Sequence, residues 1–216
     1  MCFALKNQLL FDIIYRMKKF LLILVIVVMS VVGIMLGFDI VLANINYSQN
    51  MKVWGEIETP QIIYYQQDYK NIKFGLGDIA NNGCGACSVY NILYLDNKYV
   101  PLPDIVKKLD VFGETGFGLL GAKPFSIINI LKQYGYSVNY SFRTNDFNDL
   151  AKNSRYSIYL YVGKPKGGMA GHYQLLTDYD EQKDNYQLYS PYYRNSMQNL
   201  LDYSQECFIK VLITVN

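Results

Sequence analysis

The feature that most constrains the fold of this chain is an uncharged apolar run near the N-terminus. Lys18 and Lys19 precede the stretch FLLILVIVVMSVVGIMLGF, which carries no charged side chain. A run of about twenty such residues is long enough to cross a bilayer as a helix. It is apolar on every face, unlike a helix that packs one face on a soluble domain. The run therefore predicts a transmembrane anchor or an export signal.

The two forms of this segment predict the same location for the rest of the chain. Met17 would suit the start of a signal peptide, and Val41, Leu42 and Ala43 would suit its cleavage site. A retained anchor is equally compatible, because the apolar run is longer than a usual signal core. The positive-inside rule places residues 44–216 outside the cytoplasm in both cases, at the cell membrane or secreted after cleavage.

The remaining residues suggest one domain without a nucleic-acid footprint. Residues 1–43 hold four basic and two acidic residues, which leaves sixteen of each sign in residues 44–216. A neutral domain lacks the basic surface that phosphate backbones require. We divide the chain into a cytoplasmic stub plus anchor or signal at 1–43, a linker at 44–59 and a globular domain at 60–216.

The pattern of the domain predicts an α+β fold, with N-terminal helices packed on a C-terminal antiparallel sheet. QIIYY at 61–65 is a strand candidate, and the helical candidates are 84–93, 103–109 and 123–135. Aromatic and β-branched runs then dominate, separated by Gly-rich or charged segments. These four predicted strands are 156–162, 172–179, 185–190 and 207–215. Helices first and a sheet afterwards is the order typical of α+β domains.

Cys84 is the strongest candidate for chemistry. It lies in NNGCGAC, where a loop of Asn and Gly gives way to a helical pattern. A helix N-terminus directs backbone amides and a positive dipole toward the sulfur, which favours a thiolate and predicts a lowered thiol pKa. The same amides could hold an oxyanion. A second candidate is His172, the one histidine of the chain, because an imidazole beside Cys84 would serve as a base.

These residues resemble a known family. IIYYQQDYKNIKFGLGDIANNGCGACSVYNIL, GHYQLLTDYD and LYSPYY are similar to segments of papain-like cysteine peptidases of the bacteriocin-processing, double-glycine leader type. The resemblance extends from about residue 60 to 195 and includes extracellular relatives without an ABC transporter. It implies a papain-like fold for the domain.

The resemblance also implies roles for four residues. Cys84 corresponds to the nucleophile, His172 to the general base and Gln66 to the side chain that helps to hold the oxyanion. Ser190 stands before Pro191, where the family has Asp before Pro. If 172–177 and 186–191 pair as a hairpin, the Ser190 hydroxyl would lie near His172 and could orient its ring, more weakly than a carboxylate would.

Other interpretations of the cysteines remain open. CGAC also fits the papain signature in which the second cysteine attacks, so Cys87 is an alternative nucleophile. The same motif could be a redox pair, and Cys84, Cys87, His172 and Cys207 could bind zinc by ligand type. Cys207 could instead form a disulfide with Cys87.

One glycine-rich segment resembles a phosphate-binding loop only superficially. GETGFGLLGAK at 113–123 matches G-x-G-x-x-G, but no predicted strand precedes it and no acidic residue follows at the distance of a ribose. We expect a flexible loop that borders the substrate groove.

The sequence therefore predicts an extracytoplasmic cysteine peptidase that acts on a peptide or protein and needs no metal or organic cofactor. Its oligomeric state is left open. The alternatives are a papain-like binding or immunity-type module with weak catalysis, and a cell-wall amidase. Ser190 motivates the binding alternative.

Overall fold

The computed structural model describes residues 2–57, 61–111, 113–163, 170–180, 182, 185–189 and 207–216, with side chains from Tyr15 onward except at a few positions. The chain divides into two compact units, Met1–Val41 and Leu42–Asn216. Ser190 and the segments at 164–169 and 191–206 lie outside the described residues.

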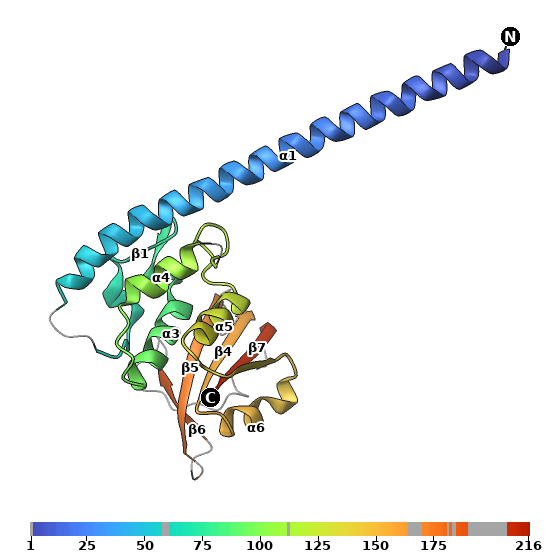
Figure 1. The fold of residues 1–216 in the computed structure, drawn as a ribbon. Helices are drawn as coiled ribbons and strands as arrows, with labels where there is room; N and C mark the ends of the chain where they lie inside the picture. Colours follow the sequence, from blue (N-terminus) through green and yellow to red (C-terminus); the bar gives the residue numbers. More distant parts are fainter. Residues whose placement is uncertain are drawn as a thin grey trace. The chain divides into compact units, whose positions relative to one another are not determined.

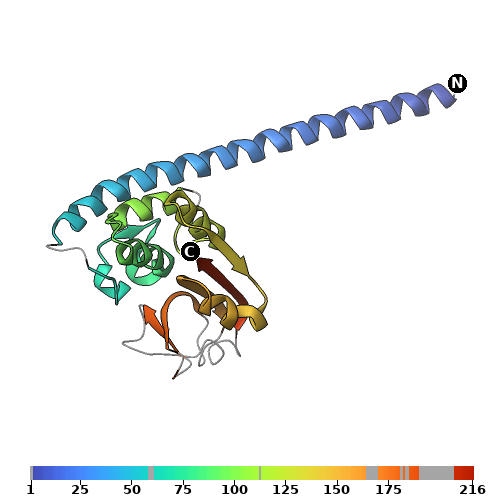
Figure 2. The same ribbon diagram turned by 60° about the horizontal axis from the view of Figure 1, so that its bottom comes forward.

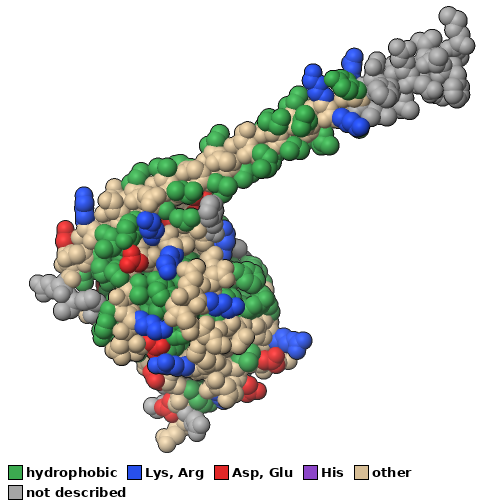
Figure 3. Space-filling model, in the orientation of Figure 1, with side chains coloured by type: hydrophobic (Ala, Val, Ile, Leu, Met, Phe, Trp, Pro, Cys, Tyr) green, Lys and Arg blue, Asp and Glu red, His purple; other side chains and the backbone are tan. Residues whose placement is uncertain are grey.

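The first unit consists of the apolar part of one long helix, α1 (Cys2–Gly55). The described part of the chain contains one helix long and apolar enough to cross a membrane, and its most apolar window has a mean hydropathy of 3.0. Side chains in this part of α1 are exposed all round, as Figure 3 shows for the visible face. This is the apolar helix that the sequence predicts as an anchor or a signal.

The last turns of α1 belong to the second unit. The Asn46 amide donates to the Gly75 carbonyl over 2.8 Å. Asn50 binds both backbone groups of Lys73, donating to its carbonyl over 2.8 Å and accepting from its N–H over 2.7 Å. Residues 44–55, for which the sequence suggests a linker, are therefore helical and hydrogen-bonded to the domain.

Short helices and two small strands follow α1. In chain order the elements are η1 (Gln66–Tyr69), β1 (Lys73–Phe74), β2 (Gly77–Asp78), α2 (Ile79–Asn82), α3 (Cys84–Leu95), α4 (Leu102–Asp110), α5 (Pro124–Gln133), β3 (Val138–Ser141), η2 (Thr144–Asp146), α6 (Phe147–Lys152), β4 (Tyr156–Gly163), β5 (Ala170–Asp180), β6 (Asn185–Tyr189) and β7 (Cys207–Val215).

The C-terminal strands form the predicted antiparallel sheet. Its order is β3-β7-β4-β5-β6, and β1 pairs separately with β2. β4 lies between β7 and β5, and its register pairs Tyr161 with His172. β3 adds an edge strand that the sequence analysis does not anticipate. The predicted strand at 61–65 is not a strand, and the Asn91 side chain of α3 binds both backbone groups of Ile63 in place of a β-ladder.

Helices cover both faces of the sheet. The larger core cluster joins α3, α4 and α5 to one face, which includes Tyr173 and Leu175 of β5. A smaller cluster joins Phe147 and Ala151 of α6 to the other face, which includes Tyr161. Figure 1 and Figure 2 show α3, α4 and α5 on one side of the sheet and α6 on the other. The predicted α+β class, with helices before an antiparallel sheet and an apolar helix in front, is confirmed.

Candidate active site around Cys84

Cys84 is the first residue of α3, which follows α2 after a single glycine. The Asp78 side chain caps α2 by accepting from the Asn81 N–H over 2.9 Å, and the Gly83 N–H returns to the Ile79 carbonyl over 2.9 Å. A Cβ at Gly83 would approach Ile79 atoms to 2.6–2.7 Å. Gly83 is needed here for steric room, since its φ of −90° is open to any residue.

The beginning of α3 packs directly on β5. A Cβ at Gly85 would lie 3.0 Å from Ile127 Cδ1 and 3.3 Å from both Ala122 Cβ and Tyr173 Cδ2. The Tyr173 hydroxyl donates to the Ala122 carbonyl over 2.8 Å. This packing brings the Cys84 sulfur to the backbone amide of Tyr173, which is the peptide group that joins His172 to Tyr173.

Burial decides the protonation state of Cys84. The residue is 7% exposed. Burial raises the pKa of the Cys84 thiol, and the opposing effect of the backbone amides of Tyr173, Gly85 and Cys84 is smaller. The expectation of an acidic thiol is therefore wrong for this structure, because desolvation of a thiolate outweighs the helix N-terminus. The resting residue is a neutral thiol.

His172 is buried in the middle of the sheet, with 2% of its surface exposed. Its ring lies edge-on to that of Tyr161, with ring centres 5.7 Å apart. Burial lowers the pKa of His172 to about 3, so that the imidazole is neutral at physiological pH. His172 pairs with Tyr161, so its ring lies on the α6 face of the sheet, whereas Cys84 lies on the opposite face with Tyr173. The structure therefore brings Cys84 to the peptide group of His172 and not to its imidazole.

Gln66 is fully buried beside the helix that precedes Cys84. Its Nε2 donates to the Ala80 carbonyl of α2 over 2.7 Å, which fixes the orientation of the amide. The Oε1 atom has no hydrogen-bond partner among the described residues. Because an amide NH₂ carries two donor hydrogens, one remains for a ligand.

Asn91 of α3 holds the segment that leads to Gln66. Its Oδ1 accepts from the Ile63 N–H over 2.8 Å and its Nδ2 donates to the Ile63 carbonyl over 2.9 Å. Asn91 is 1% exposed. The sequence analysis misses this residue, although an amide within the apolar run VYNIL is a signal that could have identified it.

The fourth predicted site residue, Ser190, lies outside the described residues. The hairpin on which its role depends is present, because β6 pairs antiparallel with β5 and Leu175 is the partner of Tyr189. The position of the Ser190 hydroxyl therefore stays a prediction.

The other cysteines are structural in this state. Cys84, Cys87 and Cys207 are buried and form no disulfide with one another. Cys87 belongs to the same core cluster as Cys84, whereas Cys207 belongs to the cluster on the other sheet face. Burial, with the nearby Cys84 adding to it, raises the pKa of Cys87 far above its usual range. The Cys87–Cys207 disulfide is absent, and the three cysteines considered for zinc are divided between two clusters.

The glycine-rich segment is an ordered loop at the edge of this site. The Thr115 N–H donates to the Gly121 carbonyl over 2.8 Å, and the Leu76 N–H donates to the Phe117 carbonyl over 2.7 Å. Gly118 has a φ of +83°. The loop ends at Ala122, which lies against the Gly85 position. It therefore borders the surroundings of Cys84.

The chain is similar to two solved peptidase-domain structures. One is the peptidase domain of Streptococcus ComA, described as a bifunctional ABC transporter involved in a quorum-sensing pathway; the TM-score is 0.44 at 13% identity, covering 61% of this chain and 89% of that one. Another is the Streptococcus mutans ComA peptidase domain with a small-molecule inhibitor; the TM-score is 0.33 at 15% identity, covering 44% and 75%. No protein-family model and no curated protein matches the sequence.

Proposed function

We propose that the domain is a thiol peptidase that hydrolyses a peptide or amide bond through Cys84 and His172. The observation that carries the proposal is the position of the Cys84 sulfur, at the first residue of α3 and beside the amide that joins His172 to Tyr173. Acyl transfer requires a base beside the nucleophile, so the proposal also requires the His172 ring to turn from the Tyr161 face toward α3 when substrate binds.

The neutral state of both groups defines the first step. Once its ring has turned toward α3, neutral His172 accepts the thiol proton while the Cys84 sulfur bonds to the substrate carbonyl carbon. The carbonyl oxygen becomes an oxyanion, which accepts hydrogen bonds from the Cys84 amide and from the second Nε2 hydrogen of Gln66. The His172 imidazolium then protonates the leaving amine as the C–N bond breaks, which leaves a thioester on Cys84.

Water completes the cycle. His172, neutral again, takes a proton from a water molecule that attacks the thioester carbonyl, and the Cys84 thiolate leaves and recovers the proton. The chemistry uses side chains and backbone amides of this chain alone. The substrate class that fits is a peptide or protein.

Ser190 acts in this proposal as the group that orients the imidazole. Its hydroxyl would accept the ring N–H of His172, and a carboxylate would do so more strongly. Ser190→Asp should raise turnover about tenfold, a part of the roughly 10²–10⁴-fold that general-base catalysis contributes. A folded Ser190→Asp variant with unchanged turnover would contradict the assigned role.

The location and partners follow from the apolar helix and the charge. We assign the domain to the outside of the cytoplasm, attached to the membrane by α1 or released after cleavage. On the visible face in Figure 3, basic and acidic side chains of the second unit are interspersed, in keeping with a partner other than nucleic acid.

A binding or immunity-type module is the second candidate. The burial of Cys84 and the low pKa of His172 favour it, because both groups rest uncharged and enclosed. The two candidates differ in turnover. The full chain, incubated with a mixed library of fluorogenic peptides, should release fluorophore, and Cys84→Ser should abolish the release.

Three outcomes of this assay are informative. Release by the wild type that Cys84→Ser abolishes supports the peptidase. Absence of release from peptides, together with new amino groups released from purified cell-wall material, would assign an amidase instead. Tight peptide binding without release would assign the binding module.

A further inference from the structure

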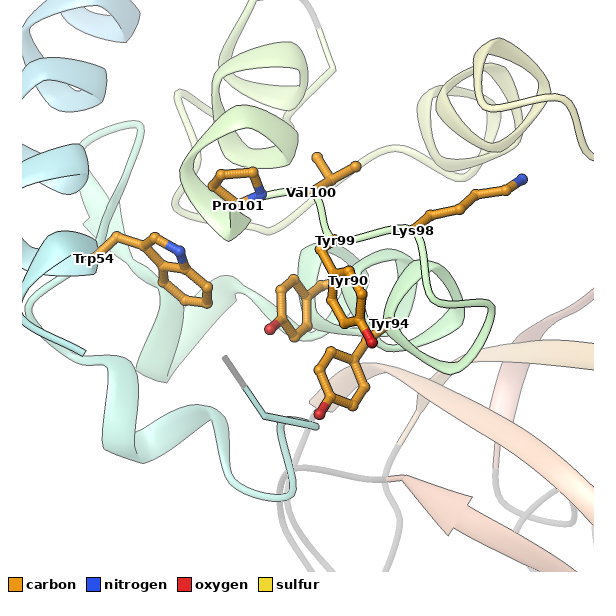
Figure 4. Close-up of a pocket in the computed structure, with 7 residues that line it drawn as sticks. All are labelled: Trp54, Tyr90, Tyr94, Lys98, Tyr99, Val100 and Pro101. Atoms are coloured by element: carbon orange, nitrogen blue, oxygen red, sulfur yellow. The ribbon is translucent and has the colours of Figure 1, made fainter. Parts of the chain in front are cut away.

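A small pocket lies at the opposite end of α3 from Cys84. It is lined by Trp54, Tyr90, Tyr94, Lys98, Tyr99, Val100 and Pro101, and its volume is about 50 Å³. We call it the aromatic pocket. Figure 4 shows Trp54 on one side, the three tyrosine rings on the other, and Val100 and Pro101 along a third.

The rings of the aromatic pocket present faces and edges in alternation. Trp54 and Tyr90 are 5.5 Å apart at 74°, and Tyr94 and Tyr99 are 5.8 Å apart at 77°. Tyr90 and Tyr94 are stacked, with centres 6.1 Å apart. Tyr99 is 67% exposed, so this wall is open to solvent. Such walls suit a compact apolar group.

Tyr90 adds an unused polar group to these walls. It is 2% exposed, and its hydroxyl has no hydrogen-bond partner among the described residues. Burial holds the pKa of Tyr90 above its ordinary value, so the phenol keeps its proton and is a donor. A buried hydroxyl without a partner destabilises the fold, and a ligand with an acceptor would supply the missing hydrogen bond.

The charge of the pocket is low. Lys98 contributes its aliphatic stem, because its Nζ donates to the Tyr134 carbonyl over 2.9 Å and lies 3.9 Å from the centre of the Tyr136 ring. Figure 4 shows this side chain extending away from the rings. The residues that line the pocket include no carboxylate. The ligand that fits is therefore uncharged where it enters.

We propose that the aromatic pocket binds a proline residue of an extended peptide. The pyrrolidine ring would pack on the aromatic faces, and the carbonyl that precedes it would accept from the Tyr90 hydroxyl. Proline has no N–H to leave unpaired in an apolar pocket. A quaternary ammonium would use the rings but would leave the hydroxyl without an acceptor.

The size and position of the pocket agree with this ligand. A cavity of about 10–15 Å³ holds one water molecule, so about 50 Å³ accommodates a ring of five atoms. Tyr90 and Tyr94 follow Cys84 by six and ten residues, about 9 and 15 Å along the helix axis. An extended peptide covers that distance in about three to five residues. Proline binding in the aromatic pocket does not itself depend on catalysis by Cys84.

The single tryptophan of the chain reports directly on the pocket, because it is Trp54. The full chain in a non-ionic detergent is titrated with acetylated, amidated pentaproline while its tryptophan fluorescence is recorded. We expect a saturable change, with binding at least tenfold weaker for the matching pentaalanine peptide. Tyr90→Phe, which keeps the ring, should weaken pentaproline binding about fivefold.

Two further variants test whether binding occurs in the aromatic pocket. Tyr99→Ala, at an exposed position, should weaken binding at least tenfold, and Tyr140→Phe, on the exposed part of β3, should leave it unchanged. The proposal is overturned if pentaproline gives no saturable change, or if Tyr99→Ala binds like the wild type. It is equally overturned if tetramethylammonium binds more tightly than pentaproline, or if Tyr90→Phe has no effect.

Discussion

Asn91 and Ile63 are joined by two hydrogen bonds, 2.8 and 2.9 Å long, that connect a side chain of α3 to both backbone groups of a residue outside any ladder. Both residues are buried. The Asn91 amide takes the place of a neighbouring strand, because it pairs with the Ile63 N–H and carbonyl, which would otherwise be buried without partners. Gln66 follows Ile63 by three residues, so this pair fixes the approach of Gln66 to α2.

Asn91→Ala should destabilise the domain by about 2–4 kcal/mol, because it leaves two buried backbone groups unpaired. Urea unfolding measures the loss. Asn139→Ala, at an exposed position on β3, is the matched control and should change the free energy of unfolding by less than about 0.5 kcal/mol. Equal effects of the two substitutions would contradict the role of Asn91.

Gly85→Ala should destabilise the domain by about 1–2 kcal/mol, since the new methyl group would press on Ile127, Ala122 and Tyr173 together. Three separate elements contribute these atoms, so no single side chain can move aside. Gly171→Ala is the control, because its added Cβ would meet only Val162 at an ordinary 3.5 Å. Thermal unfolding distinguishes the two, and a stable Gly85→Ala variant would show that α3 and β5 are less closely packed than described.

The stability of the domain should fall as the pH falls from about 7 toward 3. The pKa of His172 is about 3 in the folded chain, against 6.5 for the free side chain. Between these values the unfolded chain binds a proton that the folded chain does not, so acid favours unfolding. The slope due to His172 approaches about 1.4 kcal/mol per pH unit.

The chain has one histidine, so this slope can be assigned. Urea unfolding between pH 7 and 5.5 avoids most carboxylate titration. His172→Gln, which stays uncharged, should lack the slope over that range. If the stability of the wild-type protein does not change between these pH values, His172 is accessible to solvent and has the pKa of a free side chain.

Alkylation of Cys84 in the resting protein should show a pH inflection above that of a free thiol, about 8.5. Burial of the sulfur is the reason. A variant with Cys2→Ser, Cys87→Ser and Cys207→Ser isolates the residue, and rates of iodoacetamide modification across pH 6–11 give the inflection. An inflection well below 8.5 would mean that the helix N-terminus and His172 dominate after all.

Much of the fold could be predicted from the sequence because the patterns there are local. Alternating aromatic residues indicate the strands β4 and β5 by themselves. Gly135, which has a φ of +89°, likewise indicates the end of α5. The segment at 61–65 has the composition of a strand, yet it binds Asn91 instead of a ladder. Its partner lies 28 residues away, which no local pattern reveals.

For the candidate site, the sequence could nominate residues but could not predict their electrostatics. The motif around Cys84 correctly indicates a helix start, and the helix dipole by itself would lower the thiol pKa. Whether burial outweighs the dipole depends on Tyr173 and Ile127, which pack on Gly85 from β5 and α5. The same holds for His172, whose low pKa comes from its enclosure in the sheet.

The most direct test of the account is covalent capture at Cys84 by a peptidyl acyloxymethyl ketone, a probe that requires an activated thiol at a peptide-binding site. The full chain is treated at pH 7.5 and the modified residue is identified by peptide mass mapping. We predict one adduct, on Cys84, formed at least tenfold more slowly in His172→Gln and at an unchanged rate in Cys207→Ser. An adduct on Cys87, or capture of Cys84 at the same rate in His172→Gln, would contradict the proposed Cys84–His172 mechanism.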